Sequence, residues 1–362
     1  MEINAARRDV LAAPLHALTL PELQERFALD GVNAYQARQV FQALHRYGAR
    51  TLDAMPDVSA ACKRYLSTQP PLQTLSIDAV HRASDGTLKL RLAAGGGNAI
   101  EAVVIPSPQR VTLCVSSQVG CAAGCTFCHT ATMGLLRNLD AWEIVEQVRL
   151  ANETWALEPH SQGRAISNLV FMGMGEPLHN EAHVAQACRI LSDVTGLGFA
   201  NRHLVVSTAG VGARIRPFWE LGVGALAISL HATTDDVRNR IVPLNRLCGV
   251  AELRGILLDI PWRNRESVTI AYLLLDGIND SRDDAMRLSE WIEGLPAKVN
   301  LLEFNPYPGS ELRRTSPERL AEFRGWLRDF GVFNTLRRSR GEDAMAACGQ
   351  LASAIKRPKI IG

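Results

Sequence analysis

The sequence has little that would suit it to a membrane or to secretion. Its longest apolar run, residues 221–230, is too short to span a bilayer. The first twenty residues lack the sustained apolar stretch and the cleavage site of a secretory signal peptide. A formal net charge of +2 is also too small to mark a nucleic-acid-binding protein by itself. We therefore expect a cytoplasmic protein with no membrane contact.

The chain also lacks the cysteine arrangement of a structural zinc site. Cys121, Cys125 and Cys128 form one CxxxCxxC stretch, without a second CxxC pair or a nearby His-x₃-His. Structural zinc normally needs four protein ligands, so this stretch provides too few. An iron–sulfur cluster usually has four thiolate ligands, and with three it would keep one iron open for chemistry. Three ordinary buried cysteines are the alternative, but their clustering beside Gly120 and Gly124 argues against it.

The remaining composition is ordinary for a soluble globular protein. Its 362 residues are 47% apolar and 21% charged, enough for one large domain or one with a smaller partner. In a reducing cytosol its eight cysteines are more often metal ligands, catalytic groups or buried side chains than disulfides. Basic clusters at 313–314 and 337–340 suit phosphate contact, although a solvated face is the slightly favoured alternative.

Residues 1–74 are expected to form a small helical accessory domain with possible RNA contacts. Periodic apolar residues predict helices over 21–27, 35–46 and 58–66, with Thr19 and Asn33 as N-caps of the first two.

From about residue 75 the apolar residues recur at every second position, as in a β-strand. Residues 75–110 are then expected to form a β-hairpin linker with strands at 87–92 and 99–105. Glu101 lies on the second strand, where the pattern alone predicts a solvent-facing carboxylate.

From Val111 onward strands and helices alternate, which predicts an α/β fold with a parallel sheet, a partial (β/α)₆ barrel over residues 111–309. A further helix at 317–330 and strand at 333–337 lead into a C-terminal extension, residues 310–362, that carries Cys348. The expected strands are 111–115, 168–172, 203–207, 225–230, 268–274 and 299–304, and the expected helices are 141–155, 181–194, 213–221, 235–240, 250–260 and 282–293.

Each unusual motif follows one of the predicted strands. These motifs are the cysteine loop, the GMGEP segment at 173–177, and those at 207–210, 229–231, 276–280 and 305–309. The carboxyl ends of parallel barrel strands form one active-site face, so a shared cavity is expected there.

Taken singly, most of these motifs have simpler explanations. A glycine-rich turn is often only a loop, and Ser207 or Ser229 can be a satisfied polar group at a strand end. His231 can be a core histidine, and Asn305 before Pro306 can be a turn former. Cys348 alone would be interpreted as a helix cysteine in the core.

Together, LCVSSQVGCAAGCTFC, MGMGEPL, SLHA, NPYPG and AACGQL closely resemble the radical S-adenosylmethionine (SAM) RNA methyltransferases of the RlmN family, which methylate C2 of adenine. The resemblance extends over nearly the whole chain. Pro177 argues against the related C8-methylating branch, where alanine is expected. His129 after the cluster motif is a local departure, because serine or alanine is commoner there.

The resemblance implies a role for each motif. A [4Fe–4S] cluster would be held by Cys121, Cys125 and Cys128. Cys348 would carry the transferred methyl group, Cys114 would resolve the adduct, and Glu101 would be the general base, which overrides its solvent-facing interpretation. The residues expected to bind SAM are Gly175, Glu176, Ser207, Ser229, Leu230, His231 and Asn305.

The same resemblance implies the partners. The expected substrates are adenosines in 23S rRNA, near the peptidyl transferase centre, and in tRNA, 3′ of the anticodon. An electron donor such as flavodoxin is expected, and the protein is expected to be a monomer. Two alternatives remain: a radical SAM paralogue that modifies another position such as C8, and a non-enzymatic RNA-binding protein with a structural cluster.

Overall fold

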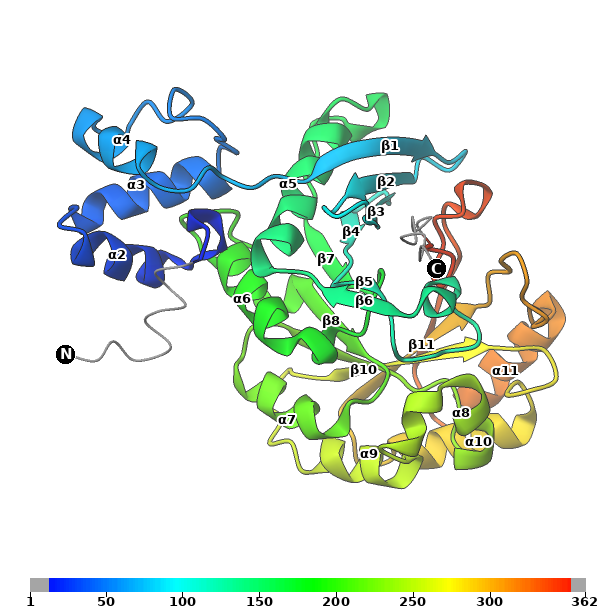
Figure 1. Ribbon diagram of the computed structural model, residues 1–362. Helices are drawn as coiled ribbons and strands as arrows, with labels where there is room; N and C mark the ends of the chain where they lie inside the picture. The colour runs from blue at the N-terminus through cyan, green and yellow to red at the C-terminus, as the bar shows by residue number, and fades with distance from the viewer. Residues whose placement is uncertain (1–12, 353–362) are drawn as a thin grey trace, which may run out of the picture.

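The computed structural model describes residues 13–352, which form a small helical unit and a large curved sheet with helices outside it (Figure 1). The helical unit consists of η1 (Leu15–Ala17), α2 (Leu20–Leu29), α3 (Ala34–His45) and α4 (Ala60–Ser67). Thr19 and Glu22 form a capping box at the start of α2, and the Asn33 side chain accepts a hydrogen bond from the Tyr35 N–H. Both predicted N-caps are confirmed.

The helical unit packs against the outer helices of the sheet. The His16 ring contacts Trp142 edge-on, with 5.3 Å between ring centroids. Arg50 forms an ion pair of 2.5 Å with Glu146, whose side chain is almost fully buried. Apolar side chains of α2 and α3, such as Phe27 and Phe41, are fully buried in the same core as the sheet.

One ten-stranded sheet forms the body of the molecule, in the order β1-β2-β3-β4-β7-β8-β9-β10-β11-β12. The first three strands and β4 are antiparallel neighbours, and from β4 to β12 every pairing is parallel. The strands are β1 (Ser76–Arg82), β2 (Leu88–Ala93), β3 (Ala99–Pro106), β4 (Val111–Cys114), β7 (Asn168–Phe171), β8 (Leu204–Thr208), β9 (Ala225–Ser229), β10 (Val268–Leu274), β11 (Ala297–Glu303) and β12 (Asn334–Arg337).

Helices follow the parallel strands and cover the outside of the sheet, as a partial α/β barrel requires (Figure 1). Their ends agree with the predicted helices to within two residues. They are α5 (Ala141–Ala156), α6 (Glu181–Ser192), α7 (Gly212–Glu220), α8 (Asp235–Ile241), α9 (Val250–Leu258), α10 (Arg282–Ile292) and α11 (Pro317–Asp329).

Three strand features differ from the sequence prediction. The edge strand β1 was missed because its side chains are mostly exposed and show no clear alternation. A two-stranded hairpin, β5 (Gln118–Gly120) with β6 (Leu135–Asn138), was too short to recognise. Finally, the strand predicted at 333–337 was assigned to the C-terminal extension, but as β12 it pairs in parallel with β11 and so belongs to the barrel sheet.

The C-terminal segment (residues 338–352) folds back over the antiparallel strands. Figure 1 shows it, in red, beside β2 and β3. The Gly341 N–H donates to Asp85 Oδ2 at 3.1 Å, and the Ser84 N–H donates to Asp343 Oδ2 at 2.9 Å. The turn between β1 and β2 therefore anchors the start of the segment that carries Cys348.

Candidate active site

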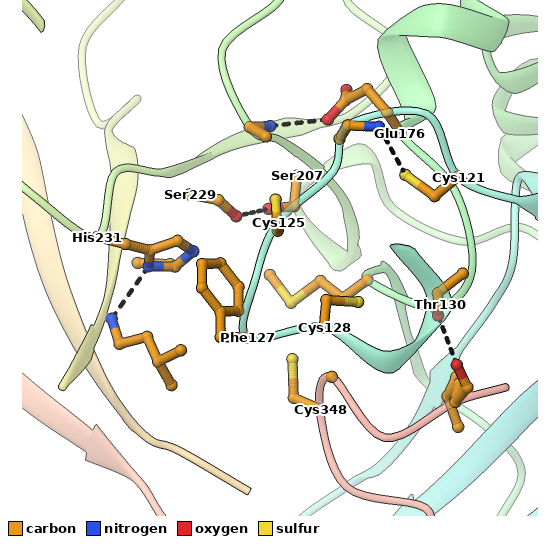
Figure 2. A pocket seen from close by; sticks show the side chains of 18 of the residues that line it. Cys121, Cys125, Phe127, Cys128, Thr130, Glu176, Ser207, Ser229, His231 and Cys348 are labelled. Atoms are coloured by element: carbon orange, nitrogen blue, oxygen red, sulfur yellow. Dashed lines mark hydrogen bonds between the residues drawn. The ribbon is translucent and has the colours of Figure 1, made fainter. Parts of the chain in front are cut away.

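The cysteine loop extends from the end of β4 across the mouth of the barrel. Gly120 has a φ of +76°, and a Cβ there would lie 1.8 Å from the Gly134 carbonyl oxygen, so only glycine fits before Cys121. Cys121, Cys125 and Cys128 all line one cavity (Figure 2). Phe127 packs edge-on against the His231 ring, with 4.8 Å between centroids.

The GMGEP segment after β7 interlocks with this loop. The Met174 carbonyl accepts from the Ser117 N–H at 2.8 Å, and the Glu176 N–H donates to Gln118 Oε1 at 2.8 Å. A Cβ on Gly173 would lie 2.6 Å from the Val115 carbonyl oxygen. The glycine therefore permits a close backbone contact that joins two walls of the cavity.

Glu176 lines the cavity but its oxygens have local partners. Oε2 accepts from the Ala209 N–H at 2.8 Å, and Oε1 accepts from the Leu178 N–H at 3.0 Å. Burial raises the pKa of this carboxyl group, and the backbone donors oppose that shift. Glu176 thus links the segment after β7 to the end of β8.

The next strand ends add polar groups to the same wall. Ser207 Oγ and Ser229 Oγ lie 3.2 Å apart. His231 Nδ1 accepts from the Leu273 N–H at 3.0 Å. Burial lowers the pKa of His231 to about 3, so the ring is neutral with its proton on Nε2. His231 is the buried histidine that the simpler interpretation predicted, and its ring also lines the cavity, where the Nε2–H can act as a hydrogen-bond donor.

Asn305 and Cys348 meet at the far wall. Asn305 Nδ2 donates to the Cys348 carbonyl oxygen at 3.0 Å, and its Oδ1 accepts from Arg314 at 3.1 Å. Cys348 is exposed to the cavity and lies in a turn, so its interpretation as a buried helix cysteine is wrong. Figure 2 shows its side chain directed into the cavity beside Cys128 and Phe127.

Cys114 and Glu101 lie just behind this cavity and are absent from its lining. Burial, followed by the charge of Cys348, raises the pKa of Cys114 to about 12. Glu101 is only 4% exposed, so the solvent-facing interpretation from its strand pattern is wrong. The C-terminal segment covers it: the Ala352 N–H donates to Glu101 Oε2 at 3.2 Å.

Leu230 is one predicted SAM-binding residue that does not line the cavity. Its side chain is fully buried, and its carbonyl oxygen accepts from Arg238 Nε at 2.8 Å. Arg238 was missed from the sequence, where it looks like an ordinary arginine of a helix. Completely buried, it also donates to the carbonyl oxygens of Ala209 and Ser229 and so joins the ends of β8 and β9.

The donor set fits an iron–sulfur cluster better than a single metal ion. Within residues 13–352, no three His, Cys, Asp or Glu side chains converge on one point as a single ion requires. A cluster needs no such convergence, because each thiolate binds a different iron. Burial raises the pKa of the Cys121 thiol to about 12, so a thiolate there needs a bound cation to offset the desolvation.

Comparisons with known proteins agree with this geometry. Residues 115–289 match the family described as the radical SAM superfamily. The chain is 44% identical over 340 residues to the dual-specificity RNA methyltransferase RlmN of Anaeromyxobacter sp., covering 94% of this chain and 90% of that protein. It is 42% identical over 357 residues to the one of Dinoroseobacter shibae, covering 95% and 90%.

A solved structure extends the likeness to the fold. The crystal structure of a radical SAM methyltransferase from Sphaerobacter thermophilus superimposes with a TM-score of 0.85 at 41% sequence identity, covering 93% of this chain and 98% of that one. In the part of the chain that the structure describes, no helix is long and apolar enough to cross a membrane. The cysteine loop, the strand-end motifs and these relatives together identify the chain as a member of the RlmN family of radical SAM RNA methyltransferases.

Proposed function

We propose that this chain methylates C2 of adenosine in 23S rRNA, near the peptidyl transferase centre, and in tRNA, 3′ of the anticodon. The name of the relatives, dual-specificity RNA methyltransferase, supports two RNA substrates. The methyl group passes through Cys348, and two SAM molecules are consumed per methyl group transferred. The C8 position is disfavoured by Pro177, which lines the cavity where that branch is expected to have alanine.

Cys348 is the residue that connects the cofactor site to the substrate. C2 of adenine is electron-poor and cannot displace the methyl group of a sulfonium, whereas a thiolate can. We infer that Cys121, Cys125 and Cys128 would hold a [4Fe–4S] cluster. With SAM and an electron donor such as flavodoxin, this cluster would supply a 5′-deoxyadenosyl radical that removes a hydrogen atom from the methyl group on Cys348. His231 and the Ser207–Ser229 pair offer donors that orient SAM in this cavity.

Two groups behind the cavity complete the reaction. Once the methylene carbon of Cys348 is bonded to C2, the adduct loses one electron, which the oxidised cluster would accept, and the Glu101 carboxylate removes the C2 proton as general base. Cys114 then attacks the Cys348 sulfur, which leaves a Cys114–Cys348 disulfide, and the released methylene carbon takes up a proton to become the methyl group. The observation that carries this proposal is the position of Cys348 in the cavity that Cys121, Cys125 and Cys128 also line.

The test combines product analysis with a trapped intermediate. The purified protein with SAM and a reductant should convert adenosine to 2-methyladenosine in 23S rRNA and tRNA, as measured by nucleoside mass spectrometry. Cys114→Ala should accumulate an RNase-sensitive slow band on a denaturing gel, because nothing releases the base from Cys348. That band should be absent from the Cys114→Ala/Cys348→Ala double variant.

Each alternative gives a different result. Formation of 8-methyladenosine would place the chain in the C8-methylating branch. RNA binding without cleavage of SAM to 5′-deoxyadenosine would indicate a structural cluster in an RNA-binding protein. An adduct that survives the loss of Cys348 would contradict the role given to this cysteine.

A further inference from the structure

A buried lysine contacts the proposed base. Lys89 on β2 is only 8% exposed. Its Nζ lies 3.6 Å from Glu101 Oε1 and donates to the Met345 carbonyl oxygen at 3.1 Å. Burying an ammonium group is costly unless it is paired, and these two contacts offset that cost for Lys89.

The register of the strands explains why Lys89 reaches Glu101. In the antiparallel pair β2–β3, Lys89 lies opposite Val103, and Arg91 lies opposite Glu101. Lys89 is therefore the diagonal neighbour of Glu101 on the same face of the sheet, a distance that a long side chain can span. Arg91, the directly opposite residue, forms an ion pair with Asp78 instead.

Lys89 and Glu101 together bind both ends of the stretch that carries Cys348. Met345, three residues before Cys348, is bound through its carbonyl oxygen to Lys89, and Ala352, four residues after it, is bound through its N–H to Glu101 Oε2. One small, partly buried network thus joins the proposed base to the segment that carries the proposed methyl carrier.

Resting on the function proposed above, we propose that Lys89 is a positioning residue that ties the base Glu101 to the segment carrying Cys348. While the segment is closed, Lys89 divides its hydrogen bonds between Glu101 and Met345. When RNA displaces the segment, the Met345 carbonyl leaves and Lys89 stays as the partner of the carboxylate. Glu101 is then held ionised and oriented to accept the C2 proton.

The charges around Glu101 are consistent with this role. Burial raises its pKa, and Lys89 is the largest opposing influence, followed by the Ala352 N–H and, more weakly, His81 on β1. Arg91 on the same face is engaged by Asp78. On the face of the sheet that carries Glu101, Lys89 is therefore the charge best placed to keep the carboxylate ionised.

The test separates this role from a structural one. Lys89→Met should still methylate Cys348 and cleave SAM to 5′-deoxyadenosine, but release of 2-methyladenosine at pH 7 should fall roughly 10- to 100-fold. The acidic limb of its pH–rate profile should move up by about one unit, because loss of the positive charge raises the pKa of Glu101. Protein–RNA adduct should accumulate on a denaturing gel, as it should in Glu101→Gln.

Three further variants make the result decisive. Lys89→Arg keeps the charge and should retain the wild-type acidic limb. Lys89→Gln can still donate to Met345 but is neutral, so it should shift the limb even if Lys89→Met fails to fold. Lys298→Met, at an exposed lysine of β11, is the matched control and should behave as wild type.

Distinct outcomes overturn the two proposals. If the wild-type protein makes no methylated adenosine, the proposed function is wrong. The role of Lys89 is wrong if the wild type is active and the neutral variants show unchanged release and an unchanged acidic limb. It is equally wrong if they lose Cys348 methylation along with product.

Discussion

At the scale of single residues, the three cysteines of the CxxxCxxC loop have more than their spacing in common. Each lines the cavity, and burial raises the pKa of each thiol above its ordinary value. A buried thiolate without a cation is therefore unfavourable, whereas iron binding would offset its desolvation. Cys62 on α4 and Cys188 on α6 are also buried, but neither lines this cavity.

Replacing any one of Cys121, Cys125 and Cys128 by alanine should abolish cluster assembly, because each thiolate is one of only three protein ligands. We expect iron and sulfide contents close to background and no 5′-deoxyadenosine after addition of SAM and reductant. Cys62→Ala, a buried cysteine outside the site, should retain both contents. Near-normal iron and sulfide in the three cluster variants would contradict the proposed ligand set.

At the scale of elements, the cysteine loop and the C-terminal segment hold each other. The His129 N–H donates to the Gly349 carbonyl oxygen at 2.7 Å, and Thr130 Oγ1 donates to the Leu351 carbonyl oxygen at 2.6 Å. The His129 ring stacks on Tyr307, with 4.9 Å between centroids. His129, where serine or alanine is commoner in the family, therefore lies where the cysteine loop meets both the loop after β11 and the C-terminal segment.

Thr130→Val removes the side-chain bond to Leu351 without changing the volume. A hydrogen bond of this kind contributes about 1 kcal/mol, so opening of the C-terminal segment should become roughly two- to tenfold more frequent. Alkylation of Cys348 by iodoacetamide, followed by peptide mass spectrometry, should accelerate by the same factor. Thr132→Val is the control, because that hydroxyl binds only within its own loop, at His129. Equal rates in both variants would show that Thr130 does not restrain the segment.

At the scale of the whole molecule, the helical unit and the barrel share a core that contains titratable groups. His45 on α3 packs against Phe41, with 4.4 Å between ring centroids, and has a buried Nε2 without a hydrogen-bond partner. Burial, followed by the charges of His16 and Arg50, lowers the pKa of His45 from 6.5 to about 3. The folded protein therefore holds this ring neutral well below neutral pH.

This shift predicts a loss of stability in acid. Between the two pKa values the unfolded chain binds a proton that the folded chain does not, so the free energy of unfolding falls as pH falls from 6.5 toward 3. Because of His45, the free energy of unfolding should be about 2 kcal/mol lower at pH 5 than at pH 7. Urea unfolding at both pH values should show that His45→Leu loses this part of the dependence. His160→Gln, at an exposed histidine, should keep it.

The elements and the cavity were largely predictable from the sequence because they depend on local patterns. Period-two and helical patterns predicted the hairpin and the outer helices. The order of motifs after strands predicted one shared cavity, which five of the six motifs line, whereas no residue of 276–280 does. The N-caps Thr19 and Asn33 were also predictable, because each cap bonds to residues only two or three positions along the chain. By contrast, β1 was missed because an exposed edge strand carries no apolar alternation.

The sequence by itself determined the chemical groups of this protein: three cysteines on one loop, glycines where backbones must approach closely, and a lone cysteine near the C-terminus. Only the tertiary structure decided which groups meet. Lys89, Glu101 and Met345 lie far apart in the chain, and Arg238 is ordinary in its helix until it is buried between two strand ends. Such contacts depend on strand register and chain reversal, and neither leaves a local pattern for the sequence to display.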